Sequence, residues 1–419
     1  MAPTPPHKRD TWALYAEQAH AYGVAWRQCS QQERGRDALE RISRARAQMP
    51  WFKLHDLDPG VLVPEGAPPI TRAMLQNHMG AFLGDLSALE AGYRGQTSGS
   101  TGQPVEVWMC AHALAHYTIH LEWCLDRASI PLPARPRVLH LTFGTGASAS
   151  EEPLPVWDGG VLRRQDVGEE AYDVLHEVLC HFLPHILTTT PRGLERLVSS
   201  TTLPELPALR LILTTTTALP ESLIEEATRR FACPVVDSYG AAEIGPVAAR
   251  CPANPARGLW HVPAGSAWLE ATALGVAITT LRNRAMPLTR YLTGDHIEGL
   301  IDEHHCEACG HMGQSFARLS GRGATELQDR HGRALSPLPL IRLMMAPEHG
   351  VRRFQLVVEA PGVAQLRLVL DRGKPPSAKL SEGARAALPG FDLDVTSAPP
   401  RLTSRGKAPA IFFSPDEEP

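Results

Sequence analysis

The central part of the chain alternates between short apolar runs and longer stretches with helical spacing. From about residue 95 to 250, aliphatic and β-branched runs are followed by segments in which apolar positions recur every three or four residues. Strands that alternate with helices in this way indicate βαβ units, with a parallel sheet covered by helices on both faces. The predicted strands are 137–143, 186–189, 209–214 and 234–238, and the predicted helices are 111–128, 169–182, 191–200 and 220–231.

The segments that flank this region have a different pattern. Helical spacing predicts a helix over 11–48 and another over 72–83, whose first turn the Thr71 hydroxyl can cap. Short strands follow over 266–301, within a β-rich subdomain of about 250–320.

The C-terminal part has shorter elements and room for a small α+β domain. Helices are predicted near 337–345 and 377–388, and strands near 351–358, 365–371 and 391–396. We therefore predict an α/β fold with mainly parallel sheets in a large N-terminal domain, residues 1–321, and a small mobile C-terminal domain, residues 322–419.

Charge and composition exclude several classes of function. The 419 residues include 41 Lys and Arg against 45 Asp and Glu, a net charge of −4, so no basic surface for nucleic acid is predicted. No apolar run approaches the ~18–20 residues of a membrane-spanning helix, and the N-terminus lacks the apolar region of a secretory signal. We therefore expect a cytoplasmic protein that binds neither nucleic acid nor membranes.

A loop rich in hydroxyls and glycine precedes the first helix of the alternating region. Glycine lets a backbone approach an anion closely, and successive N–H groups and hydroxyls can donate hydrogen bonds to phosphate oxygens. The same composition is typical of a flexible linker, and no Lys-Ser/Thr pair follows as in a Walker loop. The residues are Thr97, Ser98, Gly99, Ser100, Thr101 and Gly102.

Two acidic motifs come after predicted strands. Tyr239 and Gly240 follow the 234–238 strand, at the end where open parallel sheets bind ligands, and Glu243 could hold Mg²⁺ there. Asp295 follows a glycine turn in Tyr-Leu-Thr-Gly-Asp and could accept hydrogen bonds from both hydroxyls of a ribose. Taken singly, each motif is also compatible with an ordinary strand end or turn.

Two basic residues complete the set of candidates. Arg322 follows Gly321 and is either a second contact for a ribose or phosphate or a surface arginine. Lys407 lies in the Ser-Arg-Gly-Lys stretch near the C-terminus and is one of only five lysines in the chain. Its compact ammonium could neutralise a carboxylate and a phosphate together, and the alternative is a solvated lysine in the tail.

The order and spacing of these motifs resemble those of adenylate-forming enzymes. The series is TSGSTG, SYGxxE, YxTGD, GR and a terminal GK. Within that superfamily, the length and the Pro69-Ile-Thr-Arg-Ala-Met-Leu75 segment are similar to the phenylacetate–CoA ligase branch. The resemblance covers roughly residues 10–412.

This resemblance implies a ligase that works in two half-reactions. ATP and a carboxylic acid, expected to be aryl or arylacetic, form an acyl-adenylate and pyrophosphate, and the thiol of coenzyme A then attacks the adenylate. Lys407 would bridge the carboxylate and the α-phosphate, and leave when the small domain rotates. The nucleotide would be held by loop 97–102 (phosphates), Glu243 (Mg²⁺), Tyr239 and Gly240 (purine), and Asp295 and Arg322 (ribose).

A subset of the eight cysteines has the spacing of a zinc site. Cys306 and Cys309 form a C-x₂-C knuckle, which is half of a tetrahedral site. Cys251 and His261 are the candidates for the other two ligands, as in some members of the phenylacetate–CoA ligase group. The alternatives are free thiols or, in place of His261, one of three nearby histidines: His304, His305 and His311. Four protein ligands would make the site structural, not catalytic.

Three positions depart from the pattern of this branch. The segment 321–325 reads Gly-Arg-Gly-Ala-Thr and lacks the acidic hinge residue, which puts the usual rotation for the second half-reaction in question. Threonines follow the 209–214 strand where Gly/Ala-Glu-Pro is expected, so the pocket for adenine and acid is expected to be remodelled. Gln103 replaces a basic residue of the phosphate loop and removes one positive charge.

The acid pocket of the resembled fold lies between the helix after the phosphate loop and the strand ends. The hydroxyls and imidazoles there favour a hydroxylated or amino-substituted acid, with core packing as the alternative for the apolar positions. The candidates for this pocket are His116, Tyr117, His120, Phe143, Thr215 and Thr216.

Two other functions stay open: a stand-alone enzyme that loads a carrier protein or an amine, and an inactive nucleotide- or zinc-binding homologue. A homodimer is a candidate for the oligomeric state.

Overall fold

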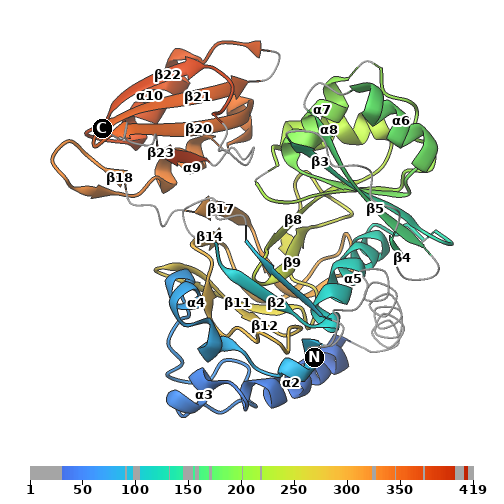
Figure 1. Cartoon of the computed structure of the whole chain (residues 1–419). Coiled ribbons are helices and arrows are strands. Elements are labelled where there is room, and N and C mark those ends of the chain that lie inside the picture. Colours follow the sequence, from blue (N-terminus) through green and yellow to red (C-terminus); the bar gives the residue numbers. More distant parts are fainter. Residues whose placement is uncertain are drawn as a thin grey trace, which may run out of the picture.

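The computed structural model has a large α/β body and a smaller α+β unit formed by the C-terminal elements (Figure 1). In the part of the chain that it describes, no helix combines the length and the apolar character needed to cross a bilayer. The described residues are 31–89, 92–97, 104–131, 133–144, 154–155, 160–168, 172–200, 202–217, 219–322, 327–344, 346–370, 373–401 and 410–413.

Ten strands form one mixed sheet through the large body. They are β3 (Arg137–Gly144), β4 (Leu154–Pro155), β5 (Val161–Gly168), β6 (Ile186–Thr189), β7 (Leu211–Thr214), β8 (Val235–Ala241), β9 (Gly245–Arg250), β10 (Trp260–His261), β15 (Ile301–His305) and β16 (Met312–Phe316). Their order in the sheet is β15-β16-β10-β9-β8-β7-β6-β3-β5-β4. The strands from β8 to β5 are parallel, and both ends of the sheet are antiparallel. The parallel centre confirms the predicted βαβ units.

Helices cover both faces of the parallel centre, as Figure 1 shows. One face packs against α5 (Ala111–Arg127), and the other against α6 (Tyr172–Phe182), α7 (Pro191–Ser199) and α8 (Glu221–Phe231). Successive strand residues point to opposite faces, so apolar neighbours are divided between the two cores. Leu139, Leu187, Ile212 and Val235 belong to the α6–α8 core, and Val138, Ile186, Leu211 and Val236 belong to the α5 core.

The N-terminal segment forms helices at the bottom of the view in Figure 1, which share a core with Met286, Leu288 and Tyr291. The Thr71 hydroxyl accepts a hydrogen bond of 3.3 Å from the Met74 N–H, which confirms the predicted N-cap. Of the helix predicted over 11–48, residues 11–30 lie outside the described residues. The elements are α2 (Gln31–Arg46), α3 (Pro50–Leu54), α4 (Arg72–His78), the 3₁₀ turns η1 (Met79–Phe82) and η2 (Leu86–Leu89), and the hairpin strands β1 (Tyr93–Gln96) and β2 (Glu106–Met109).

The predicted β-rich region forms small antiparallel sheets beside the large one. A three-stranded sheet contains β11 (Ala267–Thr272), β12 (Gly275–Thr280) and β13 (Tyr291–Leu292). A separate pair joins β14 (Asp295–Glu298) to β17 (Arg318–Arg322), with Asp295 opposite Arg322. The last two sequence motifs are therefore neighbours across one ladder.

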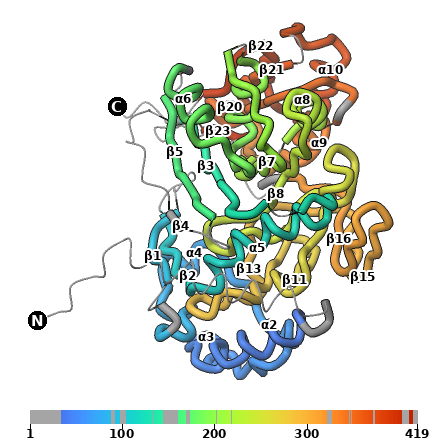
Figure 2. The backbone as a smooth tube through the Cα atoms, turned by 90° about the vertical axis from the view of Figure 1, so that its right-hand side faces the viewer, coloured from blue at the N-terminus to red at the C-terminus, as the bar shows by residue number. Residues whose placement is uncertain are grey.

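The C-terminal elements have a core of their own, which includes Leu356, Leu366, Leu368 and Leu380. Ion pairs join this unit to the large body, from Arg352 to Glu226 of α8 at 2.6 Å and from Arg353 to Glu195 of α7 at 2.9 Å. Figure 2 shows its sheet beside α8. The exact boundary at residue 321 stays a prediction.

These elements are β18 (Leu327–Gln328), β19 (Ala334–Leu335), α9 (Leu338–Met344), η4 (Pro347–His349), β20 (Val351–Ala360), β21 (Val363–Leu370), α10 (Ala378–Ala387), β22 (Asp392–Ser397) and β23 (Ile411–Phe413), and the four-stranded sheet has the order β22-β21-β20-β23.

Candidate active site

A tight turn at the end of β8 positions the first acidic candidate. A Cβ on Gly240 would lie 2.3 Å from the Gly245 carbonyl oxygen, and Gly245 itself has a φ of +70°, so both positions require glycine. The turn between them places Glu243 just beyond the carboxyl end of the strand, where it is 4% exposed. A buried carboxylate at this place needs a partner of opposite charge.

Arg72 supplies that charge. Its Nη1 donates to Glu243 Oε1 at 2.6 Å and its Nη2 to Thr97 Oγ1 at 3.0 Å. The Tyr291 hydroxyl donates to the same Glu243 oxygen at 3.4 Å. Ile70 pairs with Tyr291 as an isolated bridge, which brings the start of α4 beside the β8–β9 turn. We call Arg72, Thr97, Glu243 and Tyr291 the Glu243 cluster.

Thr97 closes the two ends of the hydroxyl-rich loop. Its N–H donates to the Val105 carbonyl at 2.9 Å, and its hydroxyl oxygen accepts from the Val105 N–H, also at 2.9 Å. Ser98, Gly99, Ser100, Thr101 and Gly102 lie between these anchors and outside the described residues, as does Gln103. The entry to the loop is therefore fixed next to Arg72.

Tyr239 and Asp295 meet on the other side of β8. The Tyr239 hydroxyl donates to Asp295 Oδ2 at 3.0 Å and lies 3.1 Å from the Thr293 hydroxyl, which in turn accepts from the Asp295 N–H at 3.1 Å. Asp295 pairs with Arg322 in the β14–β17 ladder, although only the backbone of Arg322 is described. Lys407 lies outside the described residues.

Asp237, near the start of β8, was not predicted as a site residue. It accepts hydrogen bonds from the Thr214 hydroxyl at 3.0 Å and the Leu219 N–H at 3.2 Å, and it is 3% exposed. Burial raises the pKa of this carboxyl to about 7, because the loss of hydration outweighs the hydrogen bonds to the carboxylate and the attraction of Arg250. Its role is to tie the loop after β7 to β8.

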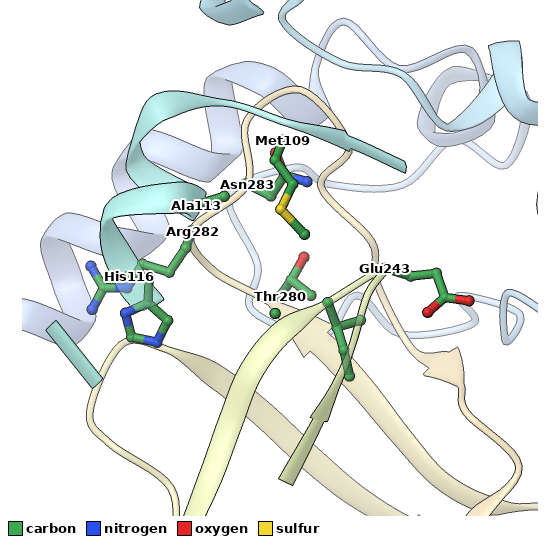
Figure 3. Close-up of a pocket in the computed structure, with 9 residues that line it drawn as sticks. Met109, Ala113, His116, Glu243, Thr280, Arg282 and Asn283 are labelled. Atoms are coloured by element: carbon green, nitrogen blue, oxygen red, sulfur yellow. The ribbon is translucent and has the colours of Figure 1, made fainter. Parts of the chain in front are cut away.

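A narrow pocket opens between α5 and the β8–β9 turn (Figure 3). His116 lies on its α5 side, where burial lowers the pKa of the imidazole to about 4, so the ring is neutral at pH 7. Glu243 borders both this pocket and the Glu243 cluster. The lining residues are Met109, Ala113, His116, Glu243, Ile244, Gly245, Thr280, Arg282 and Asn283.

The other candidates for the acid pocket lie outside this lining. His120 is one helical turn deeper, with its Nε2 2.9 Å from the Ser238 hydroxyl. Tyr117 packs near Gly245, Phe143 stacks under the Arg196 guanidinium, and Thr215 and Thr216 follow β7, where the Thr215 N–H donates to the Thr189 carbonyl.

The four predicted metal ligands come together on the side of the β-rich region. Cys251, His261, Cys306 and Cys309 each offer one donor atom, and these atoms all lie within 4.8 Å of one another. The Sγ atoms of Cys251 and Cys306 are 3.8 Å apart. Two thiolate sulfurs that each lie about 2.3 Å from a tetrahedral ion are about 3.8 Å from each other. The observed separation of the two Sγ atoms matches this value, so the donor set fits zinc.

The histidine of this group has a free coordinating nitrogen. His261 Nδ1 is 2.9 Å from the Ser315 hydroxyl, while its buried Nε2 has no hydrogen-bond partner among the described residues. Arg127 of α5 donates to the carbonyls of Cys309 and Gly310 and so holds the knuckle against the sheet. Of the substitutes, His311 stacks on His261 at 4.4 Å, and His304 and His305 lie on β15.

Arg72 and Tyr291 are site residues that sequence analysis did not assign. Arg72 was visible only as part of the PITRAML segment, and Tyr291 as the first residue of YxTGD. Neither spacing shows that both side chains reach one carboxylate, because the contact spans 171 residues of chain. A lone arginine after an N-cap carries no local signal of such a partner.

The comparisons with known proteins agree with this geometry. Residues 96–274 match the model of the family described as AMP-binding enzyme. The recognition of an adenylate-forming enzyme is thereby confirmed, whereas its phenylacetate–CoA ligase branch stays a prediction. No curated protein matches the chain.

Solved structures share the fold at low sequence identity. A 2-hydroxyisobutyryl-CoA ligase in its postadenylation state aligns with a TM-score of 0.61 at 15% identity, over 92% of this chain and 90% of that one. The anthranilate CoA ligase AuaEII aligns at 0.50 and 17%, over 75% and 64%. The amide bond synthetase McbA from Marinactinospora thermotolerans aligns at 0.50 and 16%, over 76% and 67%. These matches confirm the α/β fold class.

Proposed function

We propose that this protein uses ATP to activate a carboxylic acid as an acyl-adenylate and then transfers the acyl group to the thiol of coenzyme A. The observation that supports the proposal best is the Glu243 cluster, which joins the phosphate-loop entry to the SYGxxE turn through Arg72. The aligned structures include two CoA ligases, and each of these two is a complex with an AMP adduct of an acid.

In this proposal the phosphates of ATP lie beside Thr97 and Arg72. The attack of a carboxylate on the α-phosphorus brings two anions together, so the protein has to position them and offset their charge. Arg72 contributes the positive charge that Gln103 does not, and it holds Glu243 in place. The hydrogen bonds from Arg72 and Tyr291 to Glu243 both fall on Oε1, which leaves Oε2 for a Mg²⁺ ion that would bridge phosphate oxygens.

Tyr239, Asp295 and Arg322 would hold the nucleoside. Asp295 is oriented by the Tyr239 hydroxyl and by Thr293, so its carboxylate is already directed before a ribose binds. Gly240 allows the backbone to come close to the purine. Lys407 keeps its proposed role of bridging the carboxylate and the α-phosphate in the first half-reaction.

An amine or a carrier-protein thiol is the second candidate acceptor. The hinge segment 321–325 lacks the acidic residue that the resembled branch uses when its small domain rotates toward the thioester step. One structure that aligns with this chain is an amide bond synthetase. This alternative keeps the first half-reaction unchanged and differs only in the nucleophile that takes the acyl group.

We also propose that the Cys251, His261, Cys306 and Cys309 cluster holds a structural Zn²⁺. Sulfur and imidazole ligands are those that zinc prefers. A zinc ion would also provide a partner for the buried His261 Nε2, which has no hydrogen bond among the described residues. With four protein ligands the ion would leave no position open to a substrate. It would fasten the turn between β15 and β16 to β10 and the segment after β9.

Acid-dependent exchange of labelled pyrophosphate into ATP tests the adenylation. Exchange is expected with at least one member of a panel of carboxylic acids and is expected to fall by about 100-fold in Glu243→Gln. Glu106→Gln on β2, whose carboxylate pairs with the exposed Arg94, is the matched control. Thioester formation on adding coenzyme A would then separate the two acceptors. Exchange with no acid would overturn the proposal.

A further inference from the structure

The pocket between α5 and the β8–β9 turn contains one polar side chain without a partner. His116 is 3% exposed, and neither of its ring nitrogens forms a hydrogen bond within the described part of the chain. Burial lowers the imidazole pKa, and the Pro246 carbonyl opposes this in part as a backbone hydrogen-bond acceptor, although its contact with the ring lacks the geometry of a normal hydrogen bond. A buried unsatisfied imidazole costs folding free energy, so its presence calls for a ligand that pairs with it.

The remaining polar groups of the pocket are already engaged. The Thr280 hydroxyl donates to the Leu288 carbonyl at 3.3 Å. The Asn283 amide donates to the Trp108 carbonyl, and its oxygen accepts from the N–H groups of Cys110 and Ala285. Among the described residues, His116 is therefore the polar side chain of this lining whose ring nitrogens both lack a hydrogen bond.

The charges at the edge of the pocket are also committed. Glu243 is bound to Arg72, and Figure 3 shows its carboxylate turned away from His116. The Arg282 guanidinium donates to the Ala264 carbonyl at 3.2 Å. Neither charged side chain forms a hydrogen bond with His116 among the described residues, and a neutral imidazole suits an uncharged partner.

The pocket is also small. The space that it encloses is about that of one water molecule, between Met109 on one side and Ile244 on the other. An aromatic ring would need both side chains and the β8–β9 turn to move, whereas a single oxygen or methyl group fits. Size and polarity therefore point to the same kind of substituent.

We propose that the acid activated by this protein is a short aliphatic acid with an uncharged oxygen substituent, a hydroxyl or oxo group, which hydrogen-bonds to His116. This inference rests on the proposed acid activation and adds the class of substrate. It replaces the expected aryl or arylacetic acid. His116 would bind the acyl part beside Glu243, so the substituent would lie close to the reacting carboxylate.

Paired acids of equal shape test the proposal in the exchange assay. The panel is 2- and 3-hydroxybutyrate, their isosteres 2- and 3-methylbutyrate, 3-aminobutyrate and phenylacetate. In the wild type, one hydroxy acid is expected to exceed its methyl isostere in kcat/KM by about 10- to 100-fold, because the isostere leaves His116 unpaired. In His116→Leu this ratio is expected to fall to about one or below.

His181→Leu on α6 is the matched control, because His181 is exposed and its imidazole forms a hydrogen bond with a carbonyl of its own helix. It is expected to leave the ratio unchanged, and His116→Gln to retain part of it. Equal activation of hydroxy and methyl acids, a preference for phenylacetate, or an equal loss for every acid in His116→Leu would overturn the proposal.

A direct binding measurement separates this inference from the proposed function. The imidazole proton signal of His116, assigned by its loss in His116→Gln, is expected to shift when the hydroxy acid is added and to stay when the methyl isostere is added. A shift without exchange would overturn the adenylation and leave the pocket assignment standing. Exchange without a shift would overturn the pocket assignment alone.

Discussion

The two sides of the β8–β9 turn differ in how their polar groups are satisfied. On one side, Glu243 is a buried charge with a cation at 2.6 Å and a tyrosine hydroxyl on the same oxygen. On the other side, His116 is a buried neutral ring with both nitrogens unpaired. The two residues line the same pocket, yet one belongs to a closed network and the other does not.

This difference separates two kinds of recognition. A charged network that is complete before the ligand arrives can hold highly charged phosphates without rearranging, which is how preorganised sites stabilise charge. An unpaired neutral group contributes nothing until a ligand supplies its partner, so it discriminates between ligands that differ by one polar atom. The first side is therefore suited to the part common to all substrates, and the second to the part that distinguishes them.

Removing the cation of the closed network should have the largest effect. Arg72→Ala leaves Glu243 buried without a counter-charge and removes the donor to Thr97, so pyrophosphate exchange is expected to fall by about 100- to 1,000-fold. Arg72→Lys should recover part of this loss. The control is Arg44→Ala, which removes an exposed ion pair with Glu40. Exchange within threefold of the wild type in Arg72→Ala would contradict the role of the cluster.

His261 is a second buried imidazole with an unpaired nitrogen, and its role can be tested separately because it lies beside cysteine thiols and not beside the proposed acid pocket. We expect about one zinc per chain by metal analysis. Cys306→Ser should lose the metal and lower the free energy of unfolding by about 3 kcal/mol, because the site closes the loop between β10 and β15. Cys180→Ser on α6 should change neither quantity. Metal-free wild-type protein with full stability would contradict this assignment.

Asp237 adds a buried charge that has hydrogen bonds but no cation like that of Glu243. Its pKa is raised to about 7, so the folded chain retains a proton that the unfolded chain releases above about pH 4. Its contribution to stability is therefore lost as the pH rises from about 4 to 7. Urea unfolding should show Asp237→Asn gaining on the wild type across this range, by up to about 1.4 kcal/mol per pH unit.

The buried histidines affect both proteins alike, so the difference between the two curves isolates Asp237. Asp126→Asn on the exposed end of α5 is the control and should follow the wild-type curve. Parallel curves for the wild type and Asp237→Asn would show that this carboxyl is ionised in the folded protein like any surface aspartate.

The smallest effect is expected for His116 itself when stability is measured. His116→Leu removes no hydrogen bond between described residues, so the free energy of unfolding at pH 7.5 should stay within about 0.5 kcal/mol of the wild type. His120→Leu, one turn along α5, removes the contact with the Ser238 hydroxyl, which keeps only the longer bond of 3.5 Å to the Ala248 carbonyl, and should cost about 1–2 kcal/mol. Equal costs in urea titrations would mean that His116 has a structural partner.

The fold followed from local patterns to a large extent. Leu187, Ile212 and Val235 lie in short apolar runs between amphipathic helices, and such runs specify buried parallel strands. Strand β5 was missed because Arg163, Arg164 and Asp166 interrupt its apolar pattern near the edge of the sheet. Thr71 was recognised as a cap because its contact is three residues away.

For the candidate site, the sequence predicted individual residues but not the contacts between them. Glu243, Tyr239 and Asp295 were named from their motifs, and the structure joins the last two by a hydrogen bond of 3.0 Å. The partner of Glu243 was not predicted, because nothing near residue 72 or residue 243 indicates a pairing across 171 positions. Of the six candidates for the acid pocket, His116 lines the pocket between α5 and the β8–β9 turn, and the assignment of all six stays a prediction.

The amino-acid sequence by itself determined which chemical groups are present and which elements form, since periodicity, capping and turn glycines act over a few residues. It also determined that a C-x₂-C knuckle exists, since that spacing is local. Only the tertiary structure decided which groups satisfy one another: Arg72 with Glu243, His120 with Ser238, and His116 with no residue in the described part of the chain. Burial makes those pairings matter, and burial depends on contacts between segments that are distant along the chain.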